Sequence, residues 1–173
     1  MHGSYKIVVA TAGHLPSLPH IERSAACLFG DDVPAELLEN VTAPALLEAA
    51  QRDGTLWVAI GPNDQPVGFA RVELQGNRAH LAELDVLPAH GRRGVGRALV
   101  QQVESWAVSS ELAELTLTTY RDFPWNEPFY AQLGFAVVPV VDLDDDLLQR
   151  YEREAGLESE RARRVVMCKT LRT

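Results

Sequence analysis

The residues best suited to chemistry lie in a short stretch, Gly91 to Ala98, with the sequence GRRGVGRA. Glycines allow a backbone to approach a ligand closely, and the stretch concentrates arginines in a chain that is otherwise acidic. Where a strand meets a helix, the first-turn N–H groups lack partners inside the helix and carry partial positive charge, which suits a phosphate group. The residues concerned are Gly91, Arg92, Arg93, Gly94, Val95, Gly96, Arg97 and Ala98.

The flanking residues predict such a junction. Apolar residues from Leu81 to Val86 form an extended segment that breaks at Pro88. Beyond the glycines, apolar residues recur at three- and four-residue steps, as on one face of an amphipathic helix: Val95, Ala98, Leu99, Val103, Trp106 and Ala107. The glycines could serve the turn alone and the arginines could be merely solvated, but their combination favours a cradle for a pyrophosphate group.

The glycine spacing excludes the two most common phosphate loops. The sequence contains no GxxxxGK[ST], so the nucleoside-triphosphate loop is absent. The dinucleotide fingerprint is GxGxxG in a first βαβ unit, whereas these glycines read GxxGxG in the middle of the chain.

The segment VLPAHGRRGVGRALV resembles the acyl-CoA-binding segment of the GNAT superfamily of N-acetyltransferases. It departs from that pattern at Gly91, where the family has Arg or Gln, so Arg92 must supply what that side chain contributes. The resemblance implies acetyl-CoA as co-substrate, held mainly by backbone amides of the loop. It also implies that the preceding strand offers backbone groups to the pantetheine arm, at Leu84, Asp85 and Val86.

A second segment, PWNEPFYAQLGF from Pro124 to Phe135, resembles a later segment of the same superfamily. By this resemblance Tyr130 protonates the departing sulfur, and a phenol suits a thiolate because their ordinary pKa values are close. Asn126 matches a residue that hydrogen-bonds the cofactor arm. Tyr130 could instead be a packing aromatic, and Asn126 a helix N-cap.

Amide formation by direct attack also needs a base for the amine. Glu83 is the first candidate and His80 the second, because both lie on the strand that enters the loop. Glu83 and Asp85 share one face of that strand, which could also be merely a solvated polar face. Acceptor-site candidates are Glu22 in the first helix and three residues of the loop before Asn126: Arg121, Asp122 and Trp125. For the first two of these three, a surface ion pair is the alternative.

Composition narrows the function classes. A net charge of −8 over 173 residues argues against nucleic acid as a partner and suits a cationic substrate. No apolar run reaches the roughly 18 residues of a membrane span, and the N-terminus does not resemble a signal peptide. Two cysteines are too few for a disulfide framework or a metal cluster, and we expect both to be buried. We therefore expect a cytoplasmic protein without a bound metal.

The chain as a whole predicts one α+β domain over residues 1–173. Strands are expected at 5–10, 55–60, 66–75, 78–86, 112–120, 135–141 and 164–171, and helices at 20–29, 34–41, 43–53, 94–109, 126–133 and 142–155. Thr42 is expected to cap the third helix, and Gly54 to end it. The resemblance implies a mixed, mostly antiparallel central sheet of about seven strands flanked by helices.

Three functions fit these observations. The first is an N-acetyltransferase that acts on a small-molecule amine. The second acetylates a protein N-terminus or lysine, and the third is an acyl-CoA-binding sensor without turnover. Dimers are common in the superfamily, so a homodimer is among the states that the resemblance implies.

Overall fold

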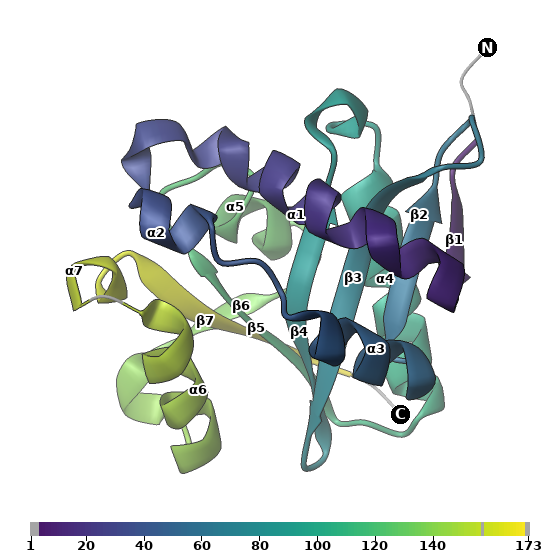
Figure 1. Ribbon diagram of the computed structural model, residues 1–173. Coiled ribbons are helices and arrows are strands. Elements are labelled where there is room, and N and C mark those ends of the chain that lie inside the picture. Colours follow the sequence, from purple (N-terminus) through teal and green to yellow (C-terminus); the bar gives the residue numbers. More distant parts are fainter. Residues whose placement is uncertain (1–3, 157, 172–173) are drawn as a thin grey trace. The chain divides into compact units, whose positions relative to one another are not determined.

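The computed structural model describes residues 4–156 and 158–171, and Figure 1 labels its elements. The chain divides into two compact units: unit 1 is residues 1–73 and 83–105, and unit 2 is residues 74–82 and 106–173. The seven strands follow the order β1-β2-β3-β4-β5-β7-β6. Two of them, β3 (Pro66–Gln75) and β4 (Arg78–Val86), contribute residues to both units. This mixed sheet confirms the predicted α+β class, and a single domain over residues 1–173 stays a prediction.

Unit 1 contains an antiparallel part of the sheet. Strand β1 (Lys6–Val9) pairs with β2 (Leu56–Ile60), and β2 pairs with β3. Just beyond the end of β4, the N–H of Leu87 donates to the carbonyl of Val67 in β3 at 2.8 Å. The observed bounds of β2, β3 and β4 agree with the prediction to within one residue.

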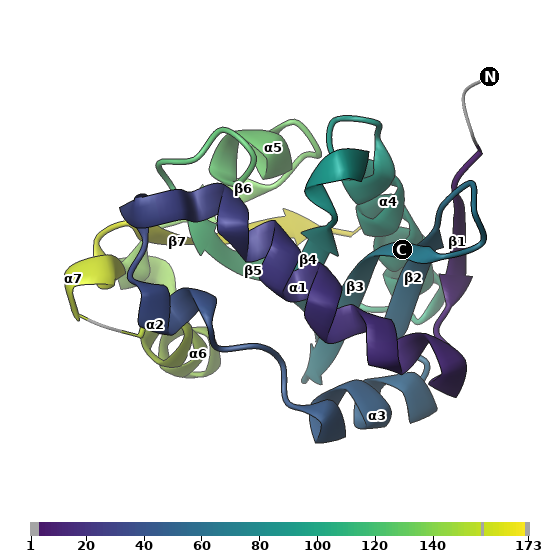
Figure 2. The ribbon, with the colours of Figure 1, turned by 45° about the horizontal axis from the view of Figure 1, so that its top comes forward.

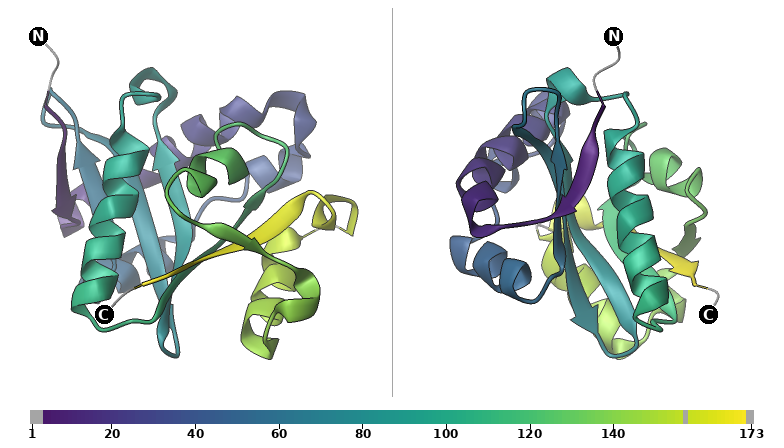
Figure 3. Two further views of the ribbon diagram at one scale, coloured as in Figure 1. Left: turned by 180° about the vertical axis from the view of Figure 1, so that it is seen from behind. Right: turned by 90° about the vertical axis from the view of Figure 1, so that its right-hand side faces the viewer.

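Helices cover both faces of these strands. Helices α1 (Leu18–Ala26) and α3 (Pro44–Arg52) lie on one face, and α4 (Val95–Ser109) lies on the other, as the right-hand view of Figure 3 shows. Figure 2 shows α1 crossing the strands, and the short helix α2 (Ala35–Leu38) follows α1 and precedes α3 in the chain. The core beneath α1 and α3 consists of buried apolar side chains: Ala10, Leu18, Ile21, Leu47, Ala50, Leu56, Val58 and Phe69.

Unit 2 is built on strand β7 (Arg164–Thr170). This strand pairs antiparallel with β5 (Glu114–Tyr120) on one side and with β6 (Ala136–Val138) on the other. Strand β5 runs parallel to the beginning of β4, with Arg78–His80 registered against Glu114–Thr116. The helices of this unit are α5 (Glu127–Ala131), α6 (Asp145–Ala155) and α7 (Glu158–Arg161). Both α5 and α6 contact β7.

Three local predictions are wrong. Thr42 does not cap α3: Ala43 holds that position, and Thr42 donates from its N–H and its hydroxyl to Glu22 instead. Strand β6 ends at Val138, because a 3₁₀ turn over Val140–Asp142 replaces the rest of the predicted strand. The cysteines are not buried: one is exposed and the other half-buried, Cys27 and Cys168.

Other local predictions agree with the structure. The third helix ends at Arg52, followed by Gly54 in a left-handed conformation. The helix predicted at 142–155 is observed as α6 from Asp145 to Ala155, and Asp144 caps it by accepting a hydrogen bond from the N–H of Leu147 at 2.9 Å. Within the described residues, every helix is too short or too polar to cross a membrane.

Candidate active site

The loop that enters α4 has the geometry of an anion cradle. Gly94 precedes the helix with a φ of +82°, and its carbonyl accepts the first helical hydrogen bond, from Ala98 at 2.9 Å. The N–H groups of the helix's first three residues, Val95 to Arg97, therefore have no acceptor one helical turn back. This first turn contains no acidic residue. It can therefore receive a negatively charged group at the positive end of the helix.

The loop brings its arginines to the surface around that turn. Arg92, Arg93 and Arg97 are all exposed. Arg92 has a φ of +57°, which is uncommon for a residue with a side chain and is a kind of strain that functional loops retain. A Cβ on Gly91 would lie 3.2 Å from the carbonyl oxygen of Pro88, so this close turn favours glycine. The departure at Gly91 thus has a local structural reason.

The last residues of β4 lie against β3 at unusually short range. A Cβ built on Gly68 would lie 2.8 Å from the backbone oxygen of Asp85 and 3.1 Å from Cγ2 of Val86. Gly68 therefore allows the two backbones to approach. The recorded register between β4 and β5 covers only Arg78–His80, so Leu84–Val86 lie outside it. These are the residues expected to offer backbone groups to the pantetheine arm.

Two acidic side chains of unit 1 interact electrostatically: buried Glu22 of α1 and half-buried Asp85 of β4. Glu22 of α1 is buried and accepts hydrogen bonds from the N–H of Thr42 at 2.9 Å and from its hydroxyl at 3.1 Å. Burial nevertheless raises the pKa of Glu22, against the lowering effects of Thr42 and Arg71. Asp85 of β4 has an enclosed Oδ2 with no hydrogen-bond partner among the described residues.

The environment of Asp85 opposes its ionisation. Burial, and second the charge of Glu22, raise its pKa to about 8. Leu87, two residues further along the chain, packs against the core beneath α1, which agrees with Asp85 facing the same helix. The sequence predicts that Asp85 shares a strand face with Glu83, but it does not predict an interaction with Glu22. Two features of the sequence could have indicated these acids. Asp85 stands between two apolar residues of its strand, and Glu22 follows Ile21 on the apolar face of its helix.

The two predicted base candidates have different surroundings. Glu83 is half-buried on β4 in unit 1. His80 belongs to unit 2 and is fully buried. Its Nδ1 lies 2.9 Å from the hydroxyl of Thr116, and its Nε2 lies 3.3 Å from Oε1 of Glu154. This enclosure favours a structural role for His80.

The ion pair with His80 also determines the charge of Glu154. Burial alone would raise the pKa of Glu154. The adjacent His80, together with the hydrogen bond that Nη1 of Arg150 donates to Oε1 at 3.1 Å, outweighs burial and lowers this pKa to about 2. The network joins β4, β5 and α6 within unit 2.

Tyr130 and Asn126 lie on α5 in unit 2. Tyr130 is buried, with its ring centroid 5.0 Å from Phe129 and 5.8 Å from Phe135, so a packing role is present. Asn126 is at the N-cap position of α5, but its side chain makes no capping hydrogen bond. The capping alternative for that side chain is therefore wrong. The prediction that Asn126 binds the cofactor arm stays a prediction. The same holds for Tyr130 as the acid.

The loop before α5 exposes the other acceptor-site candidates, Arg121, Asp122 and Trp125. Asp122 accepts a hydrogen bond from Nε of Arg163 at 2.8 Å, and Nε of Arg121 lies 4.0 Å from Glu127. The alternative of an Arg121–Asp122 pair is therefore wrong.

Trp125 takes part in an aromatic cluster in the same loop. Its ring centroid lies 5.3 Å from that of Phe123, over which the guanidinium of Arg163 also lies at 5.5 Å. Roles for this loop in acceptor binding stay predictions.

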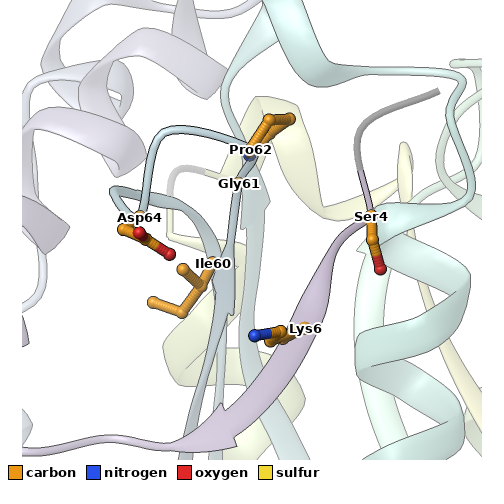
Figure 4. Close-up of a pocket in the computed structure, with 6 residues that line it drawn as sticks. All are labelled: Ser4, Lys6, Ile60, Gly61, Pro62 and Asp64. Carbon is orange, nitrogen blue, oxygen red and sulfur yellow. The ribbon is translucent and has the colours of Figure 1, made fainter. Parts of the chain in front are cut away.

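Unit 1 also has two surface hollows. One, of about 250 Å³, lies where β1 approaches the turn between β2 and β3. Figure 4 shows Lys6 and Asp64 projecting there beside Ile60. The other, of about 320 Å³, lies between α1 and α2, and begins at the residue after Glu22. It is lined by Arg23, Ala26, Cys27, Ala35, Leu38 and Glu39.

Comparisons with known proteins agree with this geometry. Residues 21–135 match the family described as the acetyltransferase (GNAT) family. The chain is 34% identical over 108 residues to the peptidyl-lysine N-acetyltransferase YjaB of Escherichia coli (strain K12), covering 62% of this chain and 64% of that protein. This chain thus aligns with just under two thirds of YjaB. It is 26% identical over 126 residues to the aminoglycoside N(6')-acetyltransferase type 1 of Klebsiella aerogenes, covering 68% and 83%.

The fold has close solved counterparts. The PaiA N-acetyltransferase from Thermoplasma acidophilum, in complex with coenzyme A, superposes with a TM-score of 0.73 at 18% identity, covering 96% of this chain and 99% of that one. At this identity the likeness concerns the fold. The family match covers more than half of the chain and includes both the acid pair's β4 strand and the loop that enters α4. The chain therefore belongs to the acetyltransferase (GNAT) family.

Proposed function

We propose that the protein is an N-acetyltransferase that transfers the acetyl group of acetyl-CoA to the primary amine of a small molecule. The observation that carries this proposal is the loop from Gly91 to Arg97, which presents unpaired first-turn N–H groups among exposed arginines. Coenzyme A carries a diphosphate, which is the kind of group that this cradle fits. Family membership supports the same co-substrate.

The proposed reaction needs no nucleophilic side chain. The amine nitrogen attacks the thioester carbonyl carbon directly, the C–N bond forms, and the C–S bond breaks. Backbone groups of Leu84–Val86 and the side chain of Asn126 hold the cofactor arm. Tyr130 gives a proton to the departing sulfur, because a thiolate leaves more readily as a thiol.

A small cationic amine is the proposed acceptor. The net charge of −8 favours encounter with a cation. The hollow between α1 and α2 has a volume of about 320 Å³, which is small-molecule size. One relative named above is an aminoglycoside acetyltransferase, and another acts on peptidyl-lysine, so a lysine side chain is the second candidate.

Binding of coenzyme A tests the cradle. Gly94→Glu and Gly96→Glu each place a carboxylate at the first turn of α4, and we expect each to weaken binding by at least about tenfold in calorimetry, since the added charge repels the diphosphate. Gln102→Glu adds the same charge at an exposed position further along α4 and serves as the control. Unchanged affinity in both glycine variants, with native circular dichroism, would remove the cradle.

Turnover separates the three functions. Release of the coenzyme A thiol from acetyl-CoA is measured with a panel of small amines, with lysine-containing peptides and without an acceptor. Stimulation by small amines supports the proposal. Stimulation by peptides alone identifies the second candidate, and binding without stimulation by any acceptor identifies a sensor.

A further inference from the structure

The side chain of Asp85 is in an unfavourable position unless it has a chemical role. Its Oδ2 is enclosed and accepts no hydrogen bond from the described residues. An enclosed acceptor without a partner destabilises the fold because it has lost its hydrogen bonds to water, and more so when it is charged. Buried polar groups are usually satisfied, so an exception is most simply explained by a ligand that completes it.

The carboxyl group of Glu22 is held in place beside Asp85. Both of its oxygens accept from the N–H of Thr42, at 2.9 and 3.0 Å, and Oε1 also accepts from the Thr42 hydroxyl. Thr42 thus fixes the orientation of Glu22. Asp85 has no such donors, so it is the member of the pair that remains able to accept a proton or a hydrogen bond.

The other charged groups around the pair leave it acidic. Helix α1 contributes Arg23, and β3 contributes Arg71, both of which act on Glu22. The Arg71 guanidinium is engaged by Glu73, with Nη1 2.6 Å from Oε1. Strand β4 itself also carries Glu83, two residues before Asp85.

We propose that Asp85 is the general base that removes a proton from the acceptor amine, and that Glu22, which Thr42 holds in place, acts through Asp85. The inference rests on the proposed function and deepens it. Asp85 lies on the segment of β4 proposed to hold the thioester arm, so a base here would be next to the reacting carbonyl. It replaces Glu83 as the first choice because of the enclosed, unpartnered oxygen.

The protons balance over the reaction. The acceptor enters as an ammonium ion, and the Asp85 carboxylate removes one proton to give the free amine, which attacks the thioester carbon. After attack, Tyr130 gives its proton to the departing sulfur, the nitrogen passes its second proton to water, and Tyr130 regains a proton from water. Asp85 then releases its proton to water. The net products are the amide, the thiol of coenzyme A and one proton.

The raised pKa of Asp85, about 8, suits this role. A base works best when its pKa lies near the working pH, because it must be ionised often enough and still hold a proton well. An ordinary aspartate would be a weak base for an ammonium ion. The like charge of Glu22 strengthens the basicity of Asp85.

The decisive experiment is the pH dependence of kcat/KM with an amine that the wild type acetylates. We expect a rising limb with a midpoint near 8, and Glu22→Gln should shift it to lower pH by about half a unit or more, because the repelling charge is gone. The titration of the amine itself would not move with this variant. Glu48→Gln removes an exposed carboxylate of unit 1 and should leave the limb in place.

Two further variants test the assignment. Asp85→Asn should lower kcat by at least about 100-fold with little change in coenzyme A affinity. Glu83→Gln should keep the rising limb. Carbon-13 NMR of the aspartate carboxyls supplies a readout without turnover: one signal should titrate near pH 8, vanish in Asp85→Asn and move to lower pH in Glu22→Gln.

The outcomes are distinct. A wild type that acetylates no amine overturns the proposed function. A wild type that does so, but whose limb is unmoved by Glu22→Gln or is lost in Glu83→Gln, overturns the role of the pair alone. Turnover of Asp85→Asn within about threefold of wild type does the same.

Discussion

A side chain on Gly68 would collide with the backbone of Asp85: its Cβ would lie 2.8 Å from the carbonyl oxygen. That distance is too short for any carbon–oxygen contact, so β3 and β4 keep this spacing only while residue 68 is glycine. The residues held in this way, Asp85 and Val86, are those proposed to line the thioester arm. The position of the proposed reaction centre in β4 therefore depends on residue 68 of β3 being a glycine.

This relationship predicts the effect of Gly68→Ala. The added methyl group should push β4 away, destabilise the fold by about 1–3 kcal/mol and raise the KM for acetyl-CoA. Steady-state kinetics and urea unfolding measure the two effects. Gly13→Ala is the control, because its Cβ would meet only Oγ1 of Thr11, at 3.8 Å. An unchanged KM in Gly68→Ala would show that the spacing of the strands does not matter for the co-substrate.

Tyr130→Phe tests the proposed acid. The variant keeps the ring that packs against Phe129 and Phe135 and removes only the hydroxyl group. Turnover should fall by about tenfold or more, while the affinity for coenzyme A changes little. Phe129→Leu, which alters the packing but not the hydroxyl, separates the two roles. Equal turnover of Tyr130→Phe and wild type would leave the tyrosine with packing alone.

The stability of the protein should fall with rising pH because of Asp85. Its pKa is raised from 3.8 to about 8 in the folded state, so between these values the folded chain holds a proton that the unfolded chain has lost. The free energy of unfolding should therefore decrease from about pH 4 to about pH 8 and then level off. Asp85→Asn should flatten this slope in urea titrations, and Glu48→Gln should not. A slope that persists in Asp85→Asn would contradict the burial of a protonated carboxyl group.

Glu154 should make the free energy of unfolding rise with pH, which is the opposite of the effect of Asp85. Its pKa is lowered from 4.5 to about 2, so its ionised form stabilises the folded state above pH 4.5, and this contribution is lost as the pH falls toward 2. Glu154→Gln should remove that part of the acid sensitivity. Glu152→Gln, exposed on the same helix, is the matched control. Thermal unfolding at pH 6 and pH 3 in the two variants measures the difference, and equal acid sensitivity in both would place the effect elsewhere.

The sequence predicted what depends on neighbours in the chain. Alternation of apolar residues gave the strands from Leu56 to Val86, and the glycines with their arginines indicated the loop before α4, because both signals are local. Contacts between distant residues left no such signal. Thr42 has the right type and place for a helix cap, yet Glu22, twenty residues earlier, takes both of its donors.

The same limit explains why the sequence suggested a catalytic role for His80, whose surroundings favour a structural one. Its position on β4 suggested a base, but its partners Thr116 and Glu154 come from β5 and α6, and only the fold brings them to its ring. For Asp85, the motif indicates a backbone role and the alternation of the strand places its side chain on the face of Glu83. Whether its carboxyl group is hydrated or enclosed depends on α1, which no local pattern specifies.

The hydrogen bonds between Thr42 and Glu22 fix the two ends of the segment between them, so that the segment itself can vary. Residues 23–41, which include α2 and all the residues that line the hollow beside α1, form a segment whose two ends are joined by these hydrogen bonds. Lengthening a closed loop costs little free energy, because the entropy changes only with the logarithm of its length. The sequence and length of this segment can therefore vary with the acceptor, while the hydrogen bonds from Thr42 keep the carboxyl group of Glu22 in place.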